Sequence, residues 1–152
     1  MIDTSHHFAS NVGQAYANEL AGSYFLTAQM YVRAASRLQV PGDEIPRLLL
    51  VLFALELALK AYLVDAGASK KTLKDFKVRH DLEKLHDMAA KAGLNLGNPE
   101  LVTVIADYRD DHKDHSFRYG ARDYVDLKDP DRAFRIISAT VNEIGKALKR
   151  KL

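Results

Sequence analysis

The segment over residues 48–63 is apolar on almost every side of a helix, and it constrains the fold more than any other part of the chain. Its longest uninterrupted apolar run covers residues 48–55 and is bounded by Arg47 and Glu56. A membrane span needs about 20 such residues, so we expect no membrane association. A helix that is apolar all round is buried among other helices. The segment therefore predicts the central helix of a helical bundle.

The remaining apolar residues recur at steps of three and four, which is the period of an α-helix. Glycine and proline residues separate these periodic segments, and strict alternation typical of strands is rare. The pattern predicts five helices, which begin near residues 13, 43, 80, 98 and 129, and loops over 69–78 and 117–128. A chain of 152 residues is the length of one domain. We therefore expect a single domain over residues 1–152, an all-α, five-helix, up-and-down bundle.

Composition excludes several classes of function. The chain has 22 Lys and Arg residues against 20 Asp and Glu residues, a formal net charge of +2, so nucleic-acid binding would need a local patch. The absence of cysteine excludes disulfides, thiolate zinc sites and cysteine nucleophiles. Residues 1–11 lack the apolar core of a signal peptide. We expect a cytoplasmic protein without a cofactor.

Glu56 is an ionisable residue inside the most apolar helix, where a carboxylate needs a partner. Lys60 follows at i+4, on the same face and in the favoured orientation. Two interpretations stay open. The pair either stabilises the bundle, or Glu56 holds a cation from another helix, such as Arg109 or Arg118, at the mouth of a cleft.

The stretch over residues 107–119 is the most polar part of the chain. If the helix continued through it, Asp107, Asp111 and His115 would share one face and could bind a divalent ion. The neighbouring Arg109 and Lys113 argue against a cation there. We therefore predict no metal site, and a plain solvated surface remains an alternative to any site in this stretch.

Acid–base chemistry on a phosphodiester is the other functional interpretation of this stretch. A histidine such as His115 can move a proton near neutral pH. An arginine such as Arg109 can stabilise the negative charge of a phosphoryl transition state. RNA carries its own nucleophile, the 2′-hydroxyl, so that such an enzyme needs no metal. Stacking of unpaired bases could come from tyrosines interleaved with arginines: Tyr108, Arg118, Tyr119, Arg122 and Tyr124.

Three segments together resemble the HEPN-domain family. They are Phe-Ala-Leu-Glu-Leu-Ala-Leu-Lys-Ala-Tyr-Leu over residues 53–63, then Gly67, then His-Asp-Leu-Glu-Lys-Leu over residues 80–85. Their order and spacing agree with that family over about residues 14–148. The resemblance implies an all-α HEPN-like bundle. Many HEPN proteins are RNA-cutting toxins or phage-defence ribonucleases.

The resemblance also implies site residues. The family signature is an arginine, a polar residue, a short spacer and a histidine, which Arg109, Asp110 and His115 match, with His112 inside the spacer. A second match, Arg79-His80 with His86, falls in the structural His-Asp-Leu element. The sequence Phe-Arg-Tyr-Gly over residues 117–120 is similar to an uncharacterised HEPN-like branch, in which Arg118 and Tyr119 would matter more.

The expected function is that of an HEPN-like protein of a bacterial defence, toxin–antitoxin or stress system, with metal-independent endoribonuclease activity as its best-supported chemistry. The alternatives are a non-catalytic nucleotide- or RNA-binding module and a protein-interaction subunit with an antitoxin or other protein partner. We expect a homodimer with the fourth helix near its two-fold axis. The candidate residues are Arg109 and His115 for catalysis, and Glu56, Lys60, Asp110, His112, Arg118, Tyr119 and Arg122 for binding.

Overall fold

A computed structural model describes residues 19–119 and 127–150 of the chain. Every regular element in these residues is helical, which confirms the all-α prediction. The helices are α2 (Glu19–Ser36), α3 (Glu44–Asp65), α4 (Lys70–Lys74), α5 (Leu82–Lys91), α6 (Glu100–Lys113) and α7 (Pro130–Arg150). No helix among the described residues has both the length and the apolarity needed to cross a membrane.

Helix α3 is the centre of the structure, as its apolar sequence predicts. It contacts α2, α5, α6 and α7, and its apolar side chains are buried along most of its length. Leu52, Leu55 and Leu59 are completely buried. Because α3 is buried along most of its length, a polar side chain on one of its buried faces must find its partner within the protein.

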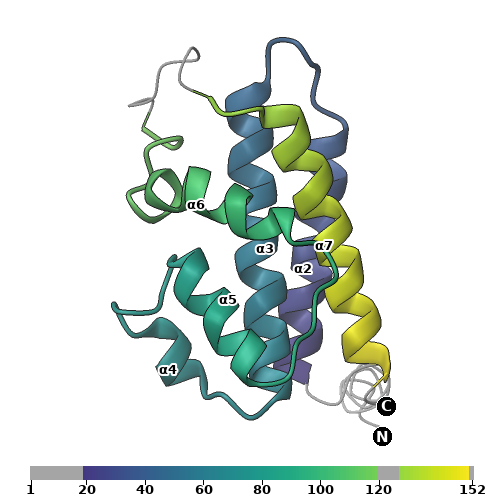
Figure 1. Ribbon diagram of the computed structural model, residues 1–152, viewed down its shortest axis with the longest axis vertical. Coiled ribbons are helices and arrows are strands. Elements are labelled where there is room, and N and C mark those ends of the chain that lie inside the picture. The colour runs from purple at the N-terminus through teal and green to yellow at the C-terminus, as the bar shows by residue number, and fades with distance from the viewer. Residues whose placement is uncertain (1–18, 120–126, 151–152) are drawn as a thin grey trace, which may run out of the picture.

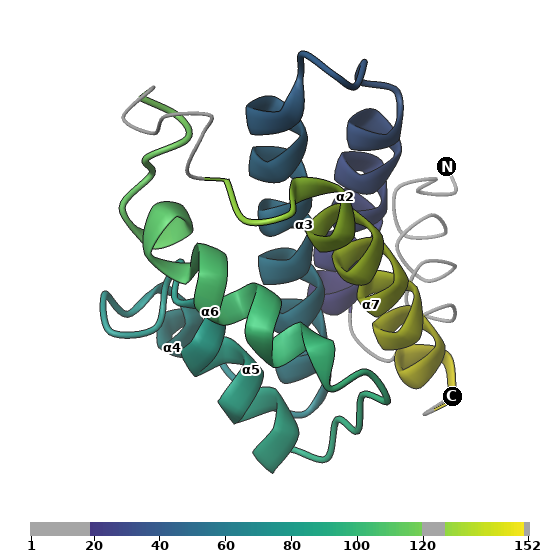
Figure 2. The same cartoon turned by 45° about the horizontal axis from the view of Figure 1, so that its top comes forward.

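The helices form two groups around α3. Helices α2, α3 and α7 run side by side along the long axis, whereas α6 crosses α3 (Figure 1). Helix α5 lies beside α6, and the two views agree on this pair (Figure 2). The up-and-down arrangement therefore describes α2, α3 and α7 but not α6. This crossing brings the C-terminal end of α6 toward the middle of α3.

Helix α4 corrects the prediction of a loop over residues 69–78 and of five helices. Its five residues include three lysines, so that their composition indicates a solvated loop. Two local features form the helix all the same. The Ser69 side chain accepts a hydrogen bond from the Thr72 backbone N–H (3.1 Å), which caps the first turn, and Leu73 is completely buried. A five-residue helix with one buried leucine is too short to show a helical period in the sequence, so the helix was not predicted.

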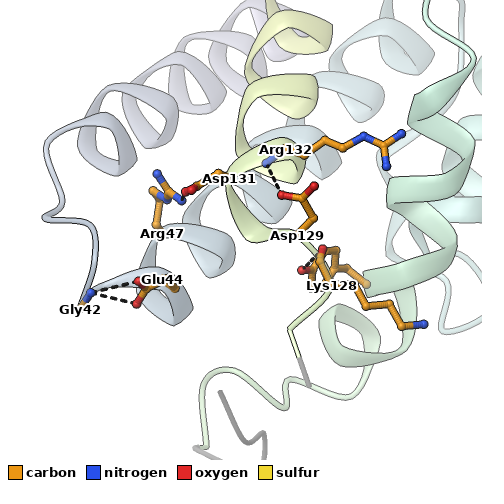
Figure 3. Close-up of polar contacts among 8 residues, drawn as sticks. Gly42, Glu44, Arg47, Lys128, Asp129, Asp131 and Arg132 are labelled. Atoms are coloured by element: carbon orange, nitrogen blue, oxygen red, sulfur yellow. Dashed lines mark hydrogen bonds and ion pairs between the residues drawn. The ribbon is translucent and has the colours of Figure 1, made fainter. Parts of the chain in front are cut away.

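The start of α7 is attached to α3 by charged and aromatic contacts (Figure 3). The Arg47 guanidinium forms an ion pair with Asp131 and lies 4.7 Å from the ring centroid of Phe134. The predicted cap at Asp129 is confirmed, because its carboxylate accepts a hydrogen bond from the Arg132 backbone N–H (3.3 Å). Before α6 the Asn98 side chain accepts a hydrogen bond from the Glu100 backbone N–H (2.9 Å), although the helix cap itself is Pro99, one residue after the predicted cap. These contacts fix the two helices that follow proline.

Candidate functional site

Glu56 is the centre of a buried polar network on α3. Lys60 Nζ donates to its Oε2 (2.8 Å), whereas His112 Nε2 (2.7 Å) and His80 Nδ1 (3.0 Å) both donate to its Oε1. The prediction that Glu56 pairs with Lys60 is confirmed. The partners from other elements are two imidazoles, one from α6 and one from the turn before α5. Arg109 and Arg118, which the sequence suggested as partners, are not among the described contacts of Glu56.

The surroundings of Glu56 keep it ionised. Burial alone would raise the pKa of this carboxyl, but the hydrogen bond and charge of His112 and those of Lys60 outweigh burial and lower the pKa from 4.5 to about 2. An ionised carboxylate only accepts hydrogen bonds. Both imidazoles therefore present an N–H group to Glu56, which fixes the position of one proton on each ring.

Aromatic contacts hold the two imidazoles in place. The Phe53 ring lies edge-on to His112, with ring centroids 4.7 Å apart, and edge-on to His80 at 6.1 Å. The His112 side chain is 1% exposed, whereas that of His80 is 30% exposed. His112 is thus a buried structural partner of Glu56, and His80 carries the network to the surface.

His115 lies next to His80, beyond the end of α6. The two ring centroids are 4.8 Å apart and the planes meet at 73°. The backbone N–H of His115 donates to the His112 carbonyl (3.3 Å), and that of Ser116 donates to the Asp111 carbonyl (2.9 Å). This bond pattern is a Schellman motif, in which His115 takes the left-handed position (φ 57°) that glycine usually occupies. His80 is also left-handed (φ 60°).

The surroundings of His115 favour its neutral form. Burial lowers the pKa of this imidazole, and the nearby His80, Arg118 and His112 lower it further, against a smaller opposing effect of Glu56. Its Nδ1 is buried and has no hydrogen-bond partner among the described residues. The accessible nitrogen of His115 is therefore Nε2. At neutral pH that nitrogen belongs to an imidazole able to accept a proton.

Glu56, His80 and His112 also have the composition of a metal site, with ligand atoms within 4.8 Å of one another. Two features oppose metal binding. Lys60 already supplies a positive charge to the carboxylate. A histidine that binds metal normally donates its other ring N–H to an acceptor, yet His112 Nδ1 is buried without a partner in the described structure. The cluster is therefore better suited to hydrogen bonds that hold protons than to binding a metal ion.

Arg109 lines a small cleft with Asp81, Asp110 and Lys113. Its guanidinium forms an ion pair with Glu83 of α5, and its Nε is 3.7 Å from the exposed Asp110 carboxylate. Lys113 pairs with Asp81 at 3.6 Å. His115 is not among the residues that line this cleft. The cleft is nevertheless adjacent in the chain to the imidazole pair, because Asp81 directly follows His80.

Arg118 and Tyr119 lie just beyond His115. Tyr119 is 77% exposed, and the Arg118 guanidinium lies 6.0 Å from the centroid of the Tyr119 ring. Arg122 and Tyr124 of the predicted basic and aromatic group lie outside the described residues. Tyr108 was also predicted to stack on bases, but it is completely buried, and its hydroxyl donates to the Lys128 carbonyl. The described part of that group thus presents one arginine and one aromatic ring to solvent.

Sequence reasoning did not anticipate two features of the site. It assigned His80 only a structural role in the His-Asp-Leu element, although His80 is the surface member of the Glu56 network. It also considered one shared face for Asp107, Asp111 and His115 in case the helix continued, but α6 ends at Lys113. Asp107 instead lies 3.7 Å from Lys128, and His115 turns toward His80. Because His115 and not glycine occupies the left-handed position, the sequence does not show where this helix ends.

Comparison of the chain with protein-family models, with curated proteins and with solved structures finds no match in any of the three. The HEPN resemblance therefore rests on the motifs of the sequence alone.

Proposed function

We propose that the chain is an HEPN-like protein of a bacterial defence, toxin–antitoxin or stress system, and that it cleaves RNA without a metal. The observation that carries this proposal is His115. It is a partly exposed imidazole with a lowered pKa, packed against a second imidazole and close in sequence to the cleft that contains Arg109 and Lys113. A general base for RNA cleavage must be unprotonated at the working pH, and the surroundings of His115 favour that form.

In the proposed reaction His115 removes the proton from a 2′-hydroxyl, whose oxygen then attacks the adjacent phosphorus. Arg109 and Lys113 would bind the phosphate oxygens and stabilise the charge that develops on them. Their present partners are Glu83 and Asp81, and the Arg109 pair with Glu83 is about half exposed on both sides. Exposed ion pairs are worth little. A phosphate can therefore replace Glu83 as the partner of Arg109 at a small energetic cost.

The test is cleavage of a labelled single-stranded RNA by the purified chain in the presence of EDTA. The wild type is expected to form products with 2′,3′-cyclic phosphate ends and to leave the DNA of the same sequence uncut, because DNA lacks the nucleophile. His115→Ala and Arg109→Ala should each lower the rate by about 10²–10⁴-fold. His86→Ala, a histidine on α5 away from the cluster, is the control and should keep full activity. Loss of cleavage in EDTA, or unchanged cleavage by His115→Ala, would contradict the proposal.

A second candidate function is non-catalytic binding of RNA or a nucleotide, and the exposed Tyr119 favours it. An aromatic ring with an arginine beside it is suited to stacking on an unpaired base, an interaction worth about 1–3 kcal/mol per base. Fluorescence anisotropy with a 2′-deoxy oligonucleotide measures binding without cleavage. If binding is the function, Tyr119→Ala should weaken the affinity by about 5–150-fold, the equivalent of that stacking energy, while the wild type cuts no RNA.

A further inference from the structure

His80 is the only member of the Glu56 network whose side chain reaches solvent to a substantial extent. Its side chain is 30% exposed, compared with 3% for Glu56, 11% for Lys60 and 1% for His112. Its Nδ1 faces the Glu56 carboxylate at 3.0 Å. The proton on Nδ1 is therefore fixed, and any proton that His80 exchanges with a ligand must be carried by Nε2.

The imidazole pair of His80 and His115 is formed by two turns that hold their backbones in the left-handed conformation. Residues other than glycine adopt this conformation at an energetic cost, and such strain often occurs at functional sites. The ring centroids are 4.8 Å apart, so the two imidazoles are direct neighbours, and both residues are partly exposed. The two turns come from different parts of the chain, and α3 joins them through Glu56.

Cleavage of RNA by its own 2′-hydroxyl requires two proton transfers. One proton leaves the 2′-oxygen when it attacks phosphorus, and another must reach the 5′-oxygen when its bond to phosphorus breaks. Arginine keeps its proton throughout, so Arg109 can perform neither transfer. His112 is buried and held by Glu56, which excludes it as well. A single His115 leaves one of the two transfers without an imidazole to carry the proton.

We propose that His80 is the second proton-transfer residue of this site and acts as the general acid opposite His115. This inference rests on the ribonuclease function proposed above. His115 Nε2 takes the 2′-hydroxyl proton while the O2′–P bond forms and the P–O5′ bond breaks. His80 Nε2 gives its proton to the leaving 5′-oxygen. The products are a 2′,3′-cyclic phosphate and a 5′-hydroxyl, and exchange with water returns one proton to His80 and removes one from His115.

Glu56 is a positioning residue in this scheme. Its carboxylate holds the Nδ1–H of His80 and thereby directs Nε2 away from the core, in the way that a buried aspartate orients the histidine of a serine protease. Lys60 balances the charge of Glu56 on the other oxygen. The buried network thus positions an exposed proton donor without contacting substrate itself.

The test compares two RNA substrates that differ in one atom of the leaving group. The first is ordinary RNA, and the second has sulfur in place of the 5′-oxygen at the cleavage site. A thiolate leaves without a proton, so that this substrate needs the base but not the acid. His80→Asn is the informative variant, because asparagine tolerates the left-handed turn and its amide can still donate to Glu56. His115→Asn and His86→Asn are the base variant and the control.

We expect His80→Asn to cut ordinary RNA about 10²–10⁴-fold more slowly than the wild type and to cut the sulfur-containing RNA at nearly the wild-type rate. His115→Asn should be slow on both substrates, and His86→Asn should be normal on both. Equal slowing of both substrates by His80→Asn, or no slowing of either, would overturn the role of His80 while the ribonuclease function stands. A wild type that cuts neither substrate would overturn the ribonuclease function and the role of His80 together.

Discussion

Glu56 and His80 are 24 residues apart in the chain, and a 3.0 Å hydrogen bond joins their side chains in the structure. This bond connects the central helix to the turn that precedes α5. The same Glu56 oxygen accepts a hydrogen bond from His112, 56 residues away on α6. One carboxylate oxygen therefore ties three separate parts of the chain together, and its removal should affect both the stability and the site.

Replacement of Glu56 by glutamine should lower the free energy of unfolding by about 3 kcal/mol at pH 7. The pKa of Glu56 is lowered from 4.5 to about 2 in the folded protein, and the side chain is almost completely buried. A lowered pKa contributes stability that is complete above pH 4.5 and is lost as the pH falls through 2. The difference between the wild type and Glu56→Gln, measured by urea unfolding, should therefore shrink steadily between those pH values. A difference independent of pH would contradict the ionised state of Glu56.

Lys60→Met should also destabilise the fold, because it leaves a buried carboxylate without its cation. Breaking a buried pair costs about 3–5 kcal/mol, and we expect the lower end because two imidazoles still donate to Glu56. The double variant Glu56→Gln with Lys60→Met should lose less than the sum of the single losses, since the residues interact directly. Glu100→Ala is the control. It breaks an exposed ion pair with Arg132 and should change stability by less than about 1 kcal/mol. Additive losses in the double variant would count against the pair.

Gly145→Ala should destabilise the protein although alanine is the better helix former. A β-carbon at this position of α7 would overlap the ring of Phe25, which is 1% exposed in the core. Overpacking costs about 1–3 kcal/mol, which exceeds the gain of about 1 kcal/mol in helix propensity. Gly97→Ala is the control, because no atom lies within 4 Å of its added carbon. Thermal unfolding should show a lower Tm for Gly145→Ala and an unchanged or higher Tm for Gly97→Ala. A raised Tm for Gly145→Ala would contradict the close packing of α7 against Phe25 of α2.

The pH dependence of RNA cleavage should reflect the lowered pKa of His115. If His115 is the base, kcat/KM should fall on the acid side with a midpoint below 6.5, the ordinary value for histidine. Arg118→Ala removes one of the charges that lower this pKa, so the midpoint should move upward. NMR titration of the His115 ring in both proteins measures the same shift independently of activity. A ring that titrates above 6.5 in the wild type would contradict its assignment as the base.

The proposed homodimer with α6 near its two-fold axis predicts a mass of twice the 17.0 kDa chain in light scattering. Val102 on α6 is 59% exposed, which suits a residue of such an interface. Val102→Glu should therefore yield a monomer. Met30→Glu is the matched control, since Met30 on α2 is similarly exposed, at 57%. A monomeric wild type at micromolar concentration would exclude the dimer.

Helical periodicity predicted the parts of the fold that depend on local sequence. The central position of α3 followed from its apolar residues, and the starts of α6 and α7 followed from Asn98 and Asp129 before proline. The pairing of Glu56 with Lys60 was also predictable, because one helix holds both residues. The helix starts and the Glu56–Lys60 pair each depend on residues that are only a few positions apart in the sequence.

The rest of the site could not be predicted in this way. Periodicity indicates which face of a helix is buried but not which residues of two faces meet, so the convergence of His80 and His112 on Glu56 stayed hidden. The end of α6 was missed because histidine, and not glycine, occupies its left-handed position. The HEPN family and the antitoxin partner stay predictions, and RNA as substrate is tested by the cleavage experiments above.

At His80 and His115 the left-handed turn lowers the stability of the fold, while the histidine side chain supplies the proposed chemistry. This conformation costs a residue with a β-carbon about 1–2 kcal/mol, and glycine adopts it freely. His80→Gly and His115→Gly would relax the backbone while removing the imidazoles. A sequence optimised only for a stable fold would therefore place glycine or asparagine in both turns. Histidine at both positions is what we expect where the side chain, and not the turn, is the useful part.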